Sequence, residues 1–354
     1  MSGAFPLAPA ARTGHNTLDG VPPFPLRMAA PMFRTLTGLT AVLATLPAAA
    51  DTPRLPDLPA PASSFGAAVV GDHAYVYGGH AGKAHTYSTE TTLGEFRRLD
   101  LKNPVKWEDL PGGPKLQGLA LVAHRGKLYR VGGMQPQNSK AEKTDTKSQA
   151  TCGVYDPKAG TWSDLEPLPE PRSSHDAVVV DDTLYVFGGW RLNGKDGKSE
   201  WLDHGWSLNL AAPGAKWQKV EQPFQRRALT AAAHGGKAYV IGGLNARGET
   251  EVTVSVYDPK AGTWSEGPPL PGEKSNGFTP ASAVAGGRLY VTPADGNLYR
   301  LAATGDRWEE AGRVREPRFV ARMVPGRDNR MVVIAGAAPG TLLSSVEAVE
   351  VAGR

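Results

Sequence analysis

A nine-residue segment occurs twice in this chain without a change. Tyr-Asp-Pro-Lys-Ala-Gly-Thr-Trp-Ser runs from Tyr155 to Ser163 and again from Tyr257 to Ser265. Pairs of glycines preceded by apolar residues recur at about half that interval, with spacings of 54, 56 and 54 residues. They lie at Gly78-Gly79, Gly132-Gly133, Gly188-Gly189 and Gly242-Gly243. A period of about 50 residues is typical of propellers and solenoids, so we expect a repeat protein.

The repeat unit has the pattern of four short strands. In the third copy, two runs rich in Val and aromatic residues flank Asp181-Asp182, which predicts a β-hairpin. The first run is almost wholly apolar, as in a strand buried on both faces, and Gly188-Gly189 ends the second run. A polar loop, a third strand, a turn and a fourth strand that begins at Trp follow. We therefore interpret the unit as one blade of a β-propeller.

A glycine pair followed by a separated Tyr and Trp resembles the kelch repeat. The second copy has Tyr155 and Trp162, and the fourth has Tyr257 and Trp264. Two copies have another aromatic residue in place of the Tyr, a fifth has lost the glycine pair, and the sixth keeps only Gly336. The resemblance extends to the central domain of galactose oxidase. It implies an all-β fold, a six-bladed kelch-type β-propeller with four antiparallel strands per blade.

The sixth blade is short of its outer strand. Residues 55–79 align without a gap on residues 165–189, which include the outer strand and the exit of another blade. We therefore expect residues 52–61 to be an N-terminal strand that completes the last blade, built by residues 319–351. This arrangement closes the ring and pairs sheet edges that would otherwise be open.

The first 50 residues have a different composition. Residues 1–31 are rich in Pro and Ala and have no periodic pattern. Arg34, an uncharged run from Leu36 to Leu46 and the small residues up to Ala50 form the pattern of a secretory signal peptide. The apolar run is too short to span a bilayer, so no membrane span is expected. We expect cleavage near Ala50 and export to the periplasm or the cell exterior; an Ala-rich tail without structure is the alternative.

The same segment sets the expected domain boundaries. Residues 1–50 are the expected signal peptide, and residues 51–354 the expected six-bladed propeller. A start at Met1 gives the signal peptide an unusually long charged region. We therefore expect the functional start at Met28 or Met32.

The composition excludes several classes of function. The chain has 39 Lys and Arg against 35 Asp and Glu, and no concentrated basic stripe, so it is a poor candidate for nucleic acid binding. Cys152 is the only cysteine, which rules out an internal disulfide, and we expect it to be a small buried residue. No phosphate-binding glycine loop, nucleophile elbow or zinc-protease motif occurs, and no cofactor is expected.

Two sets of residues are expected to meet at one end of the central channel. In a four-stranded blade, the loop after the second strand and the link into the next blade emerge on the same face. The residues of interest after the second strands are His80, Gln135, Trp190, Arg191 and Asn245. Those in the links are Arg172, Ser174, His175, Arg227, Asn276, Phe278, Arg318 and Phe319.

These residue types favour a ligand with an anionic group. Four link arginines near one channel mouth, Arg226 beside Arg227 included, suit a carboxylate, because guanidinium binds it through two parallel hydrogen bonds. The aromatic side chains suit a sugar ring or a peptide, so we predict a carbohydrate or protein ligand. The alternative for each arginine is an ion pair with a neighbouring blade that holds the ring together.

A metal site is not expected. His80 and His85 lie near Tyr87 in the first long loop, but their spacing fits no standard zinc pattern, and a hydrogen-bonded loop is the simpler interpretation. Residues 193–197 depart from calcium-loop spacing and are interpreted as a turn. A kelch-type copper oxidase needs a Cys cross-linked to a Tyr, and Cys152 stands outside any such arrangement.

Three functions remain open. The first is an exported kelch-type binding or interaction module whose ligand sits at the Arg-rich and aromatic rim. The chain also resembles periplasmic sialic acid mutarotases, which have a signal peptide and six kelch-type blades. That resemblance implies a cofactor-independent sugar mutarotase or epimerase of the N-acetylneuraminate epimerase type, although no catalytic residue is assigned. The third is a structural component of a cell-envelope assembly.

Overall fold

A computed structural model describes residues 55–351. The expected signal peptide, the two alternative start residues and residues 52–54 of the expected closing strand lie outside this range. Within it the regular structure is β-strand, apart from one short 3-10 helix, Lys274–Gly277. Among these residues no helix is long and apolar enough to cross a membrane.

The first three blades occupy the N-terminal half of the propeller. Blade 1 contains β1 (Gly66–Val70), β2 (His73–His80), β3 (Thr92–Asp100) and β4 (Glu108–Leu110). Blade 2 contains β5 (Ala120–His124), β6 (Lys127–Val131), β9 (Cys152–Asp156) and β10 (Thr161–Leu165). Blade 3 contains β11 (Asp176–Val180), β12 (Thr183–Phe187), β15 (His204–Asn209) and β16 (Gln218–Glu221).

The other three blades follow in chain order. Blade 4 contains β18 (Thr230–His234), β19 (Lys237–Ile241), β21 (Val254–Asp258) and β22 (Thr263–Gly267). Blade 5 contains β23 (Ala281–Ala285), β24 (Arg288–Thr292), β25 (Asn297–Leu301) and β26 (Trp308–Arg313). Blade 6 contains β27 (Arg322–Pro325), β28 (Arg330–Ala338) and β29 (Thr341–Glu350). Short pairs outside the blades are β7 (Met134–Pro136) with β8 (Thr146–Ser148), β13 (Trp190–Arg191) with β14 (Glu200–Trp201), and β17 (Arg226–Arg227) with β20 (Leu244–Asn245).

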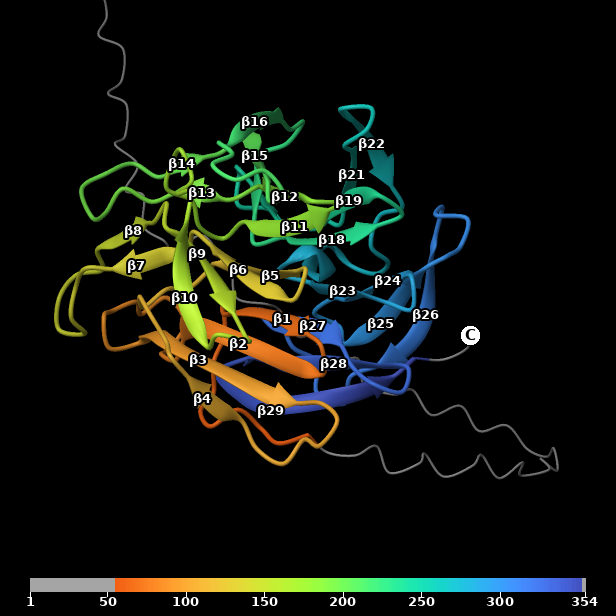
Figure 1. Cartoon of the computed structure of the whole chain (residues 1–354), viewed down its shortest axis with the longest axis horizontal. Helices are drawn as coiled ribbons and strands as arrows, with labels where there is room; N and C mark the ends of the chain where they lie inside the picture. Colours follow the sequence, from red (N-terminus) through yellow and green to blue (C-terminus); the bar gives the residue numbers. More distant parts are fainter. Residues whose placement is uncertain (1–54, 352–354) are drawn as a thin grey trace, which may run out of the picture. The chain divides into compact units, whose positions relative to one another are not determined.

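The blades close into a ring around a channel. The first strands β1, β5, β11, β18, β23 and β27 contact one another in that order, and β27 returns to β1 (Figure 1). Tight turns join first and second strands. At Gly235 and Gly236 both φ angles are positive, which is the backbone that a two-residue hairpin loop requires. The predicted six-bladed all-β propeller is confirmed.

Tryptophans bind each of blades 1 to 5 to the blade before it. The indole N–H at the start of a fourth strand donates to a backbone carbonyl in the outer strand or exit of the preceding blade, at 2.7–2.9 Å. The donors and acceptors are Trp107 and Pro56, Trp162 and Pro111, Trp217 and Glu166, Trp264 and Glu221, and Trp308 and Pro268. The repeat aromatics pack in the same seams. Tyr155 lies 4.7 Å from Phe96 between ring centroids, as their interpretation as packing residues predicts.

The first of these bonds identifies the closing segment. Because Trp107 reaches Pro56, the residues around Pro56 occupy the place of the outer strand of the preceding blade, which is blade 6. Leu58 N–H donates to the carbonyl of Ser344 in β29 at 2.8 Å, and Ala62 N–H donates to Leu343 at 3.1 Å. These two bonds do not make a regular ladder, and the blade 6 sheet has three strands.

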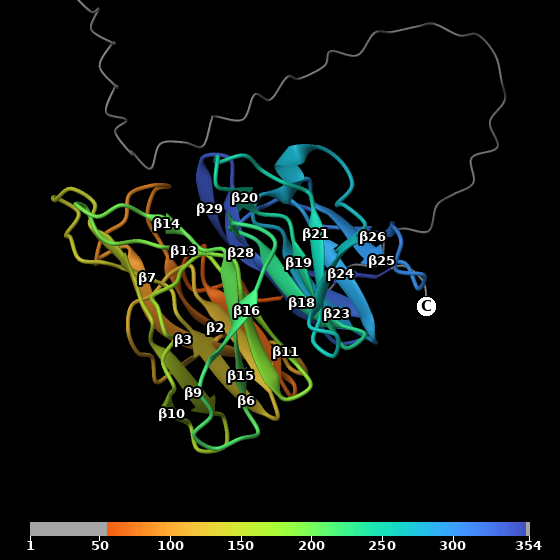
Figure 2. The same cartoon turned by 90° about the horizontal axis from the view of Figure 1, so that it is seen from above.

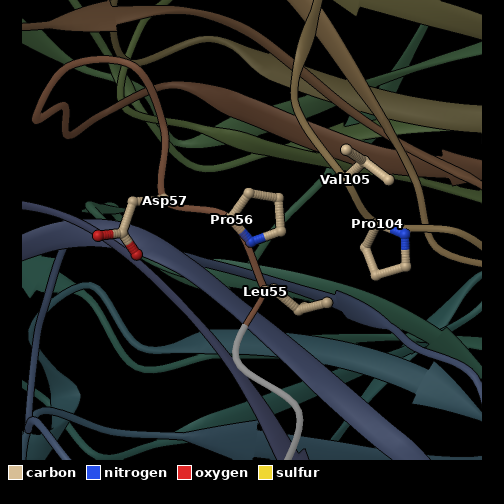
Figure 3. Close-up of a pocket in the computed structure, with 5 residues that line it drawn as sticks. All are labelled: Leu55, Pro56, Asp57, Pro104 and Val105. Carbon is tan, nitrogen blue, oxygen red and sulfur yellow. The ribbon is translucent and has the colours of Figure 1, made fainter.

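A shallow hollow marks this closing seam. Its lining residues come from the N-terminal segment and from the turn between β3 and β4 (Figure 3). They are Leu55, Pro56, Asp57, Pro104 and Val105. Leu55 is buried in the core beneath, whereas Val105 is 70% exposed. The hollow belongs to the outer edge of the propeller and contains none of the predicted site residues.

Six left-handed residues surround the channel, one in each link. They have φ angles between 45° and 60° and form what we call the axial ring: Ser64, Gly118, Ser174, Ala228, Thr279 and Val320. Each backbone N–H of the ring donates to the ring residue of the preceding blade, to its carbonyl in five cases and to the Thr279 hydroxyl in the sixth. The cycle closes when Ser64 N–H donates to Val320 at 3.4 Å.

Candidate ligand site at the channel mouth

The axial ring marks the end of the channel where links and loops meet. The link residue before a ring position pairs with the residue that follows a second strand, as in Ser63 with His80, Ser173 with Trp190, and Phe319 with Ala337. Arg227 pairs in the same way with Leu244 in β20. The two sets of predicted residues therefore come from one end of the channel, which we call the mouth.

Long loops cover half of the mouth. We define the cap as residues 81–91, 134–148 and 190–201, the loops that follow the second strands of blades 1 to 3. Thr89 N–H donates to the Asn138 carbonyl at 2.9 Å, and Ser148 N–H donates to Leu192 at 3.0 Å. These bonds join the three loops, and β7, β13 and β14 lie together at one side (Figure 2). The loop of blade 4, residues 242–253, pairs with its own link through β20 and β17, and blades 5 and 6 have only short turns, so the cap does not draw on these three blades, whose side of the mouth we call the open arc.

Three of the link arginines are bonded inside the protein. In each, an Nη group donates to the carbonyl that ends the second strand and to a carbonyl that begins the third. The partners are Gly188 and His204 for Arg172, Gly242 and Thr253 for Arg226, and Ala335 and Ser345 for Arg318. Arg172 also pairs with Glu170, and Arg318 with Glu347. These three residues are buried, and their guanidinium groups hold the blade corners.

Arg227 has a different environment. Its guanidinium carbon lies 3.9 Å from the centroid of the Trp190 ring and 5.2 Å from that of Trp201. Within residues 55–351 it forms no ion pair, and its buried Nε has no hydrogen-bond partner. Burial lowers its pKa to about 10, only partly opposed by Tyr87. A desolvated cation without a counter-ion is stabilised by any anion that reaches it.

The aromatic surroundings of Arg227 come from the cap. The Trp190 ring packs with Met134 and Tyr87, and it lies 5.9 Å from Trp201. Sequence reasoning identified Trp190 but missed Trp201 and Tyr87, because both lie in loops that do not follow the repeat. Their only signal in the sequence was an aromatic residue within a long polar loop.

Two phenylalanines border the open arc. Phe278 and Phe319 lie in the links into blades 5 and 6, are partly exposed, and have ring centroids 5.7 Å apart. Their links follow that of Arg227 in the ring order, since Thr279 N–H donates to the Ala228 carbonyl at 3.0 Å. The open arc therefore presents one cation followed by two aromatic rings.

Four other predicted residues are engaged in local structure. Asn276 is buried and donates to Pro271 and Asp295, and the Asn245 amide donates to two glutamates in its own turn. Arg191 pairs with Glu200 across the β13–β14 hairpin. The His80 ring is buried, and its Nε2 lies 3.1 Å from the Lys83 carbonyl.

Gln135 is another predicted rim residue. Gln135 is partly exposed in β7, opposite Lys147, within the cap.

Among the described residues, no cluster of three His, Cys, Asp or Glu side chains could hold a metal ion. Cys152 is buried, and burial raises its pKa to about 11, so it remains a thiol at neutral pH.

The floor of the mouth is polar and closed. Arg322 of blade 6 donates to Asp176 of blade 3 at 2.9 Å, so this ion pair spans the channel. His175 lies beside it, 2% exposed, with neither ring nitrogen bonded to a described residue. Burial, then the charges of Arg172 and Arg322, lower the pKa of His175 to about 3, so the ring is neutral.

Comparisons with known proteins agree with this architecture. A family model described as the KLHDC2/KLHL20/DRC7 Kelch-repeats domain matches residues 118–336. Kelch-like protein 35 of Mus musculus is 26% identical over 73% of this chain. N-acetylneuraminate epimerase of Haemophilus influenzae is 32% identical over 160 residues, 44% of this chain. Each match covers 38% of the relative's own length. The solved structure titled "Structure of YjhT" superposes with a TM-score of 0.67 at 18% identity, covering 84% of this chain and 99% of that one.

Proposed function

The chain belongs to the kelch-repeat family, and on that premise we propose that it is a binding module for a carboxylate-bearing ligand, carbohydrate or protein, at the channel mouth. One observation carries the proposal: Arg227 is a link arginine whose guanidinium lies against two indole rings and has no acceptor in the described chain. Guanidinium binds a carboxylate bidentately, and the indoles fix its plane in advance. Phe278 and Phe319 offer apolar rings in the next two links.

The test is calorimetric titration of the full chain with N-acetylneuraminate and with a short peptide that ends in a free carboxylate. We expect saturable binding of at least one ligand and its loss in Arg227→Met. Arg227→Lys keeps the charge but loses the planar fork, so an intermediate affinity is expected. Arg247→Met is the matched control, because Arg247 is exposed in the same blade and already paired with Glu249. Equal affinities for all four proteins would refute the proposal.

A second candidate is sugar anomer exchange. Two observations favour it: relatives named N-acetylneuraminate epimerase match this chain, and the rim has an arginine free to hold the carboxylate of such a sugar. Exchange-rate measurements by NMR on the same protein separate the candidates. Acceleration that disappears in Arg227→Met supports an enzyme, whereas binding without acceleration supports a binding module.

We also propose that the protein is exported after removal of residues 1–50. The support is the sequence pattern of a short apolar run between Arg34 and the small residues that end at Ala50. Mass mapping of the N-terminus of the exported protein tests it. A mature chain that begins at Asp51 is expected, and recovery of residues 1–27 in that material would contradict both the cleavage and the start residue.

A further inference from the structure

The axial ring keeps side chains in a backbone conformation that they rarely adopt. Five of its six residues are not glycine, and Thr279 and Val320 are β-branched, for which a positive φ is exceptional. The closed cycle of hydrogen bonds maintains this conformation. Such strained residues concentrate at functional sites, where the surrounding structure holds them in place. The ring therefore presents a fixed set of side chains to anything that enters the mouth.

Two ring hydroxyls are unused. Ser64 and Ser174 are partly exposed, and neither hydroxyl is bonded within residues 55–351. The serines that precede them differ: Ser63 and Ser173 are buried, and Ser173 Oγ lies 2.7 Å from Ser148 Oγ. The ring serines can therefore both donate to and accept from a ligand.

The ring residue between these two serines is a glycine that lies close to one of them. A Cβ atom on Gly118 would lie 3.4 Å from Ser174 Oγ and 3.3 Å from Ser174 N. A side chain at this position would occupy the volume next to the Ser174 hydroxyl. The φ of 60° favours a glycine here, although the other five ring positions carry side chains at similar φ angles.

The positive charge of Arg322, below the axial ring, is already balanced by Asp176. Two residues further along the first strands, Arg322 is paired with Asp176 and also donates to the carbonyls of Phe65 and Leu119. Its side chain remains 22% exposed. Arg322 is thus already bonded within the protein, and the groups that remain for a ligand at the axis are neutral hydroxyls.

We infer that Ser64, Gly118 and Ser174 form an axial subsite that binds hydroxyl groups of a polyhydroxylated acid whose carboxylate is held at Arg227. This inference rests on the proposed function, because it needs the Arg227 anchor. The two groups lie in adjacent links: Ala228 N–H, next to Arg227, donates to the Ser174 carbonyl at 2.8 Å. Neutral hydroxyls suit the alcohols of a sugar and give no advantage to a plain carboxylate.

The test compares two carboxylates by calorimetry on the full chain. N-acetylneuraminate carries hydroxyl groups and hexanoate does not. We expect N-acetylneuraminate to bind at least tenfold more tightly. The double variant Ser64→Ala with Ser174→Ala should lose that advantage while its hexanoate affinity stays within twofold. Gly118→Ala should have the same selective effect, because its methyl group would crowd the Ser174 hydroxyl. Ser282→Ala is the control, because its hydroxyl is bonded to Thr230 further down the channel.

The outcomes separate this inference from the proposal on which it rests. If both ligands bind equally and both need Arg227, the binding module stands and the axial subsite is refuted. If the serine and glycine variants weaken both ligands alike, the subsite is also refuted, because the loss is then structural. If neither ligand binds the unaltered chain, both the binding module and the subsite are contradicted.

Discussion

The buried contacts between blades and at blade corners, which together we call the seams, and the mouth of the channel use their polar groups in opposite ways. Arg226 and Arg227 are consecutive, yet Arg226 donates to Gly242 and Thr253 inside a seam, whereas Arg227 meets only aromatic rings. A buried donor or acceptor without a partner costs about 1–3 kcal/mol, so a seam must satisfy its polar groups internally. At the mouth, the guanidinium of Arg227 has no such internal partner among the described residues. The seams therefore determine the fold, and the mouth is free to bind.

The largest effect is expected from removal of a seam tryptophan. The Trp162 ring lies 5.4 Å from Tyr77 and 5.1 Å from Phe96, and its N–H donates to Pro111. Trp162→Ala should lower the free energy of unfolding by about 3–5 kcal/mol, because it leaves a cavity and an unpaired carbonyl. Urea denaturation followed by circular dichroism measures the loss. Val105→Ala, at an exposed site, should change little.

A smaller but clear loss is expected for a buried arginine. Arg226→Met leaves the carbonyls of Gly242 and Thr253 and the Ser255 hydroxyl without their donor. We expect a loss of about 3 kcal/mol in the same denaturation experiment. Arg247→Met, on the surface of the same blade, should stay within about 0.5 kcal/mol. Similar losses for the two variants would show that the seam does not depend on this guanidinium.

His175 differs from the other polar residues of the seams, because its buried ring is not hydrogen-bonded to a described residue. It is a polar residue in a seam, at a position where other blades have Leu119 and Leu229, and both its ring nitrogens lack partners among the described residues. His175→Leu should raise stability at pH 7 by roughly 1–2 kcal/mol, since it removes buried groups that are not hydrogen-bonded. Thermal denaturation of the two proteins at pH 7 measures the difference, and a clear loss would reveal a partner for the imidazole.

The same histidine predicts a pH dependence. Burial lowers its pKa to about 3 in the folded protein, against the ordinary value of 6.5 that it regains on unfolding, so the unfolded chain binds the proton first. Stability should therefore fall as the pH drops from about 6.5 towards 3, by about 1.4 kcal/mol for each unit. In His175→Leu this contribution disappears. Unfolding curves between about pH 7 and pH 4 test it, and parallel slopes for both proteins would contradict the assignment.

The smallest stability change is expected at the mouth. Arg227→Met removes a cation–π contact but breaks no hydrogen bond within the described chain. The expected loss is about 1 kcal/mol or less, although the same variant should abolish ligand binding. If Arg227→Met lowered the free energy of unfolding as much as Arg226→Met, Arg227 would belong to the seam residues. The distinction between seams and mouth would then be wrong.

The fold was largely predictable from the sequence. The spacing of glycine pairs and the Tyr and Trp positions predicted six blades, because each blade must repeat the same turns and seam contacts. The alignment of residues 55–79 on residues 165–189 likewise predicted closure by the N-terminal segment. The bond from Trp107 to Pro56 confirms that closure, although residues 55–62 do not form a regular ladder with β29.

The sequence alone determined which links and loops meet at the mouth, because blade topology fixes where every link and loop emerges. It did not determine which arginine lacks a partner. Arg172, Arg226 and Arg318 find carbonyls two strands away, and that depends on side-chain direction at a seam, which no local pattern encodes. Trp201 reaches Arg227 from a loop outside the repeat. Only the tertiary structure decided these contacts, because they form between segments whose relative positions are set by packing of whole blades.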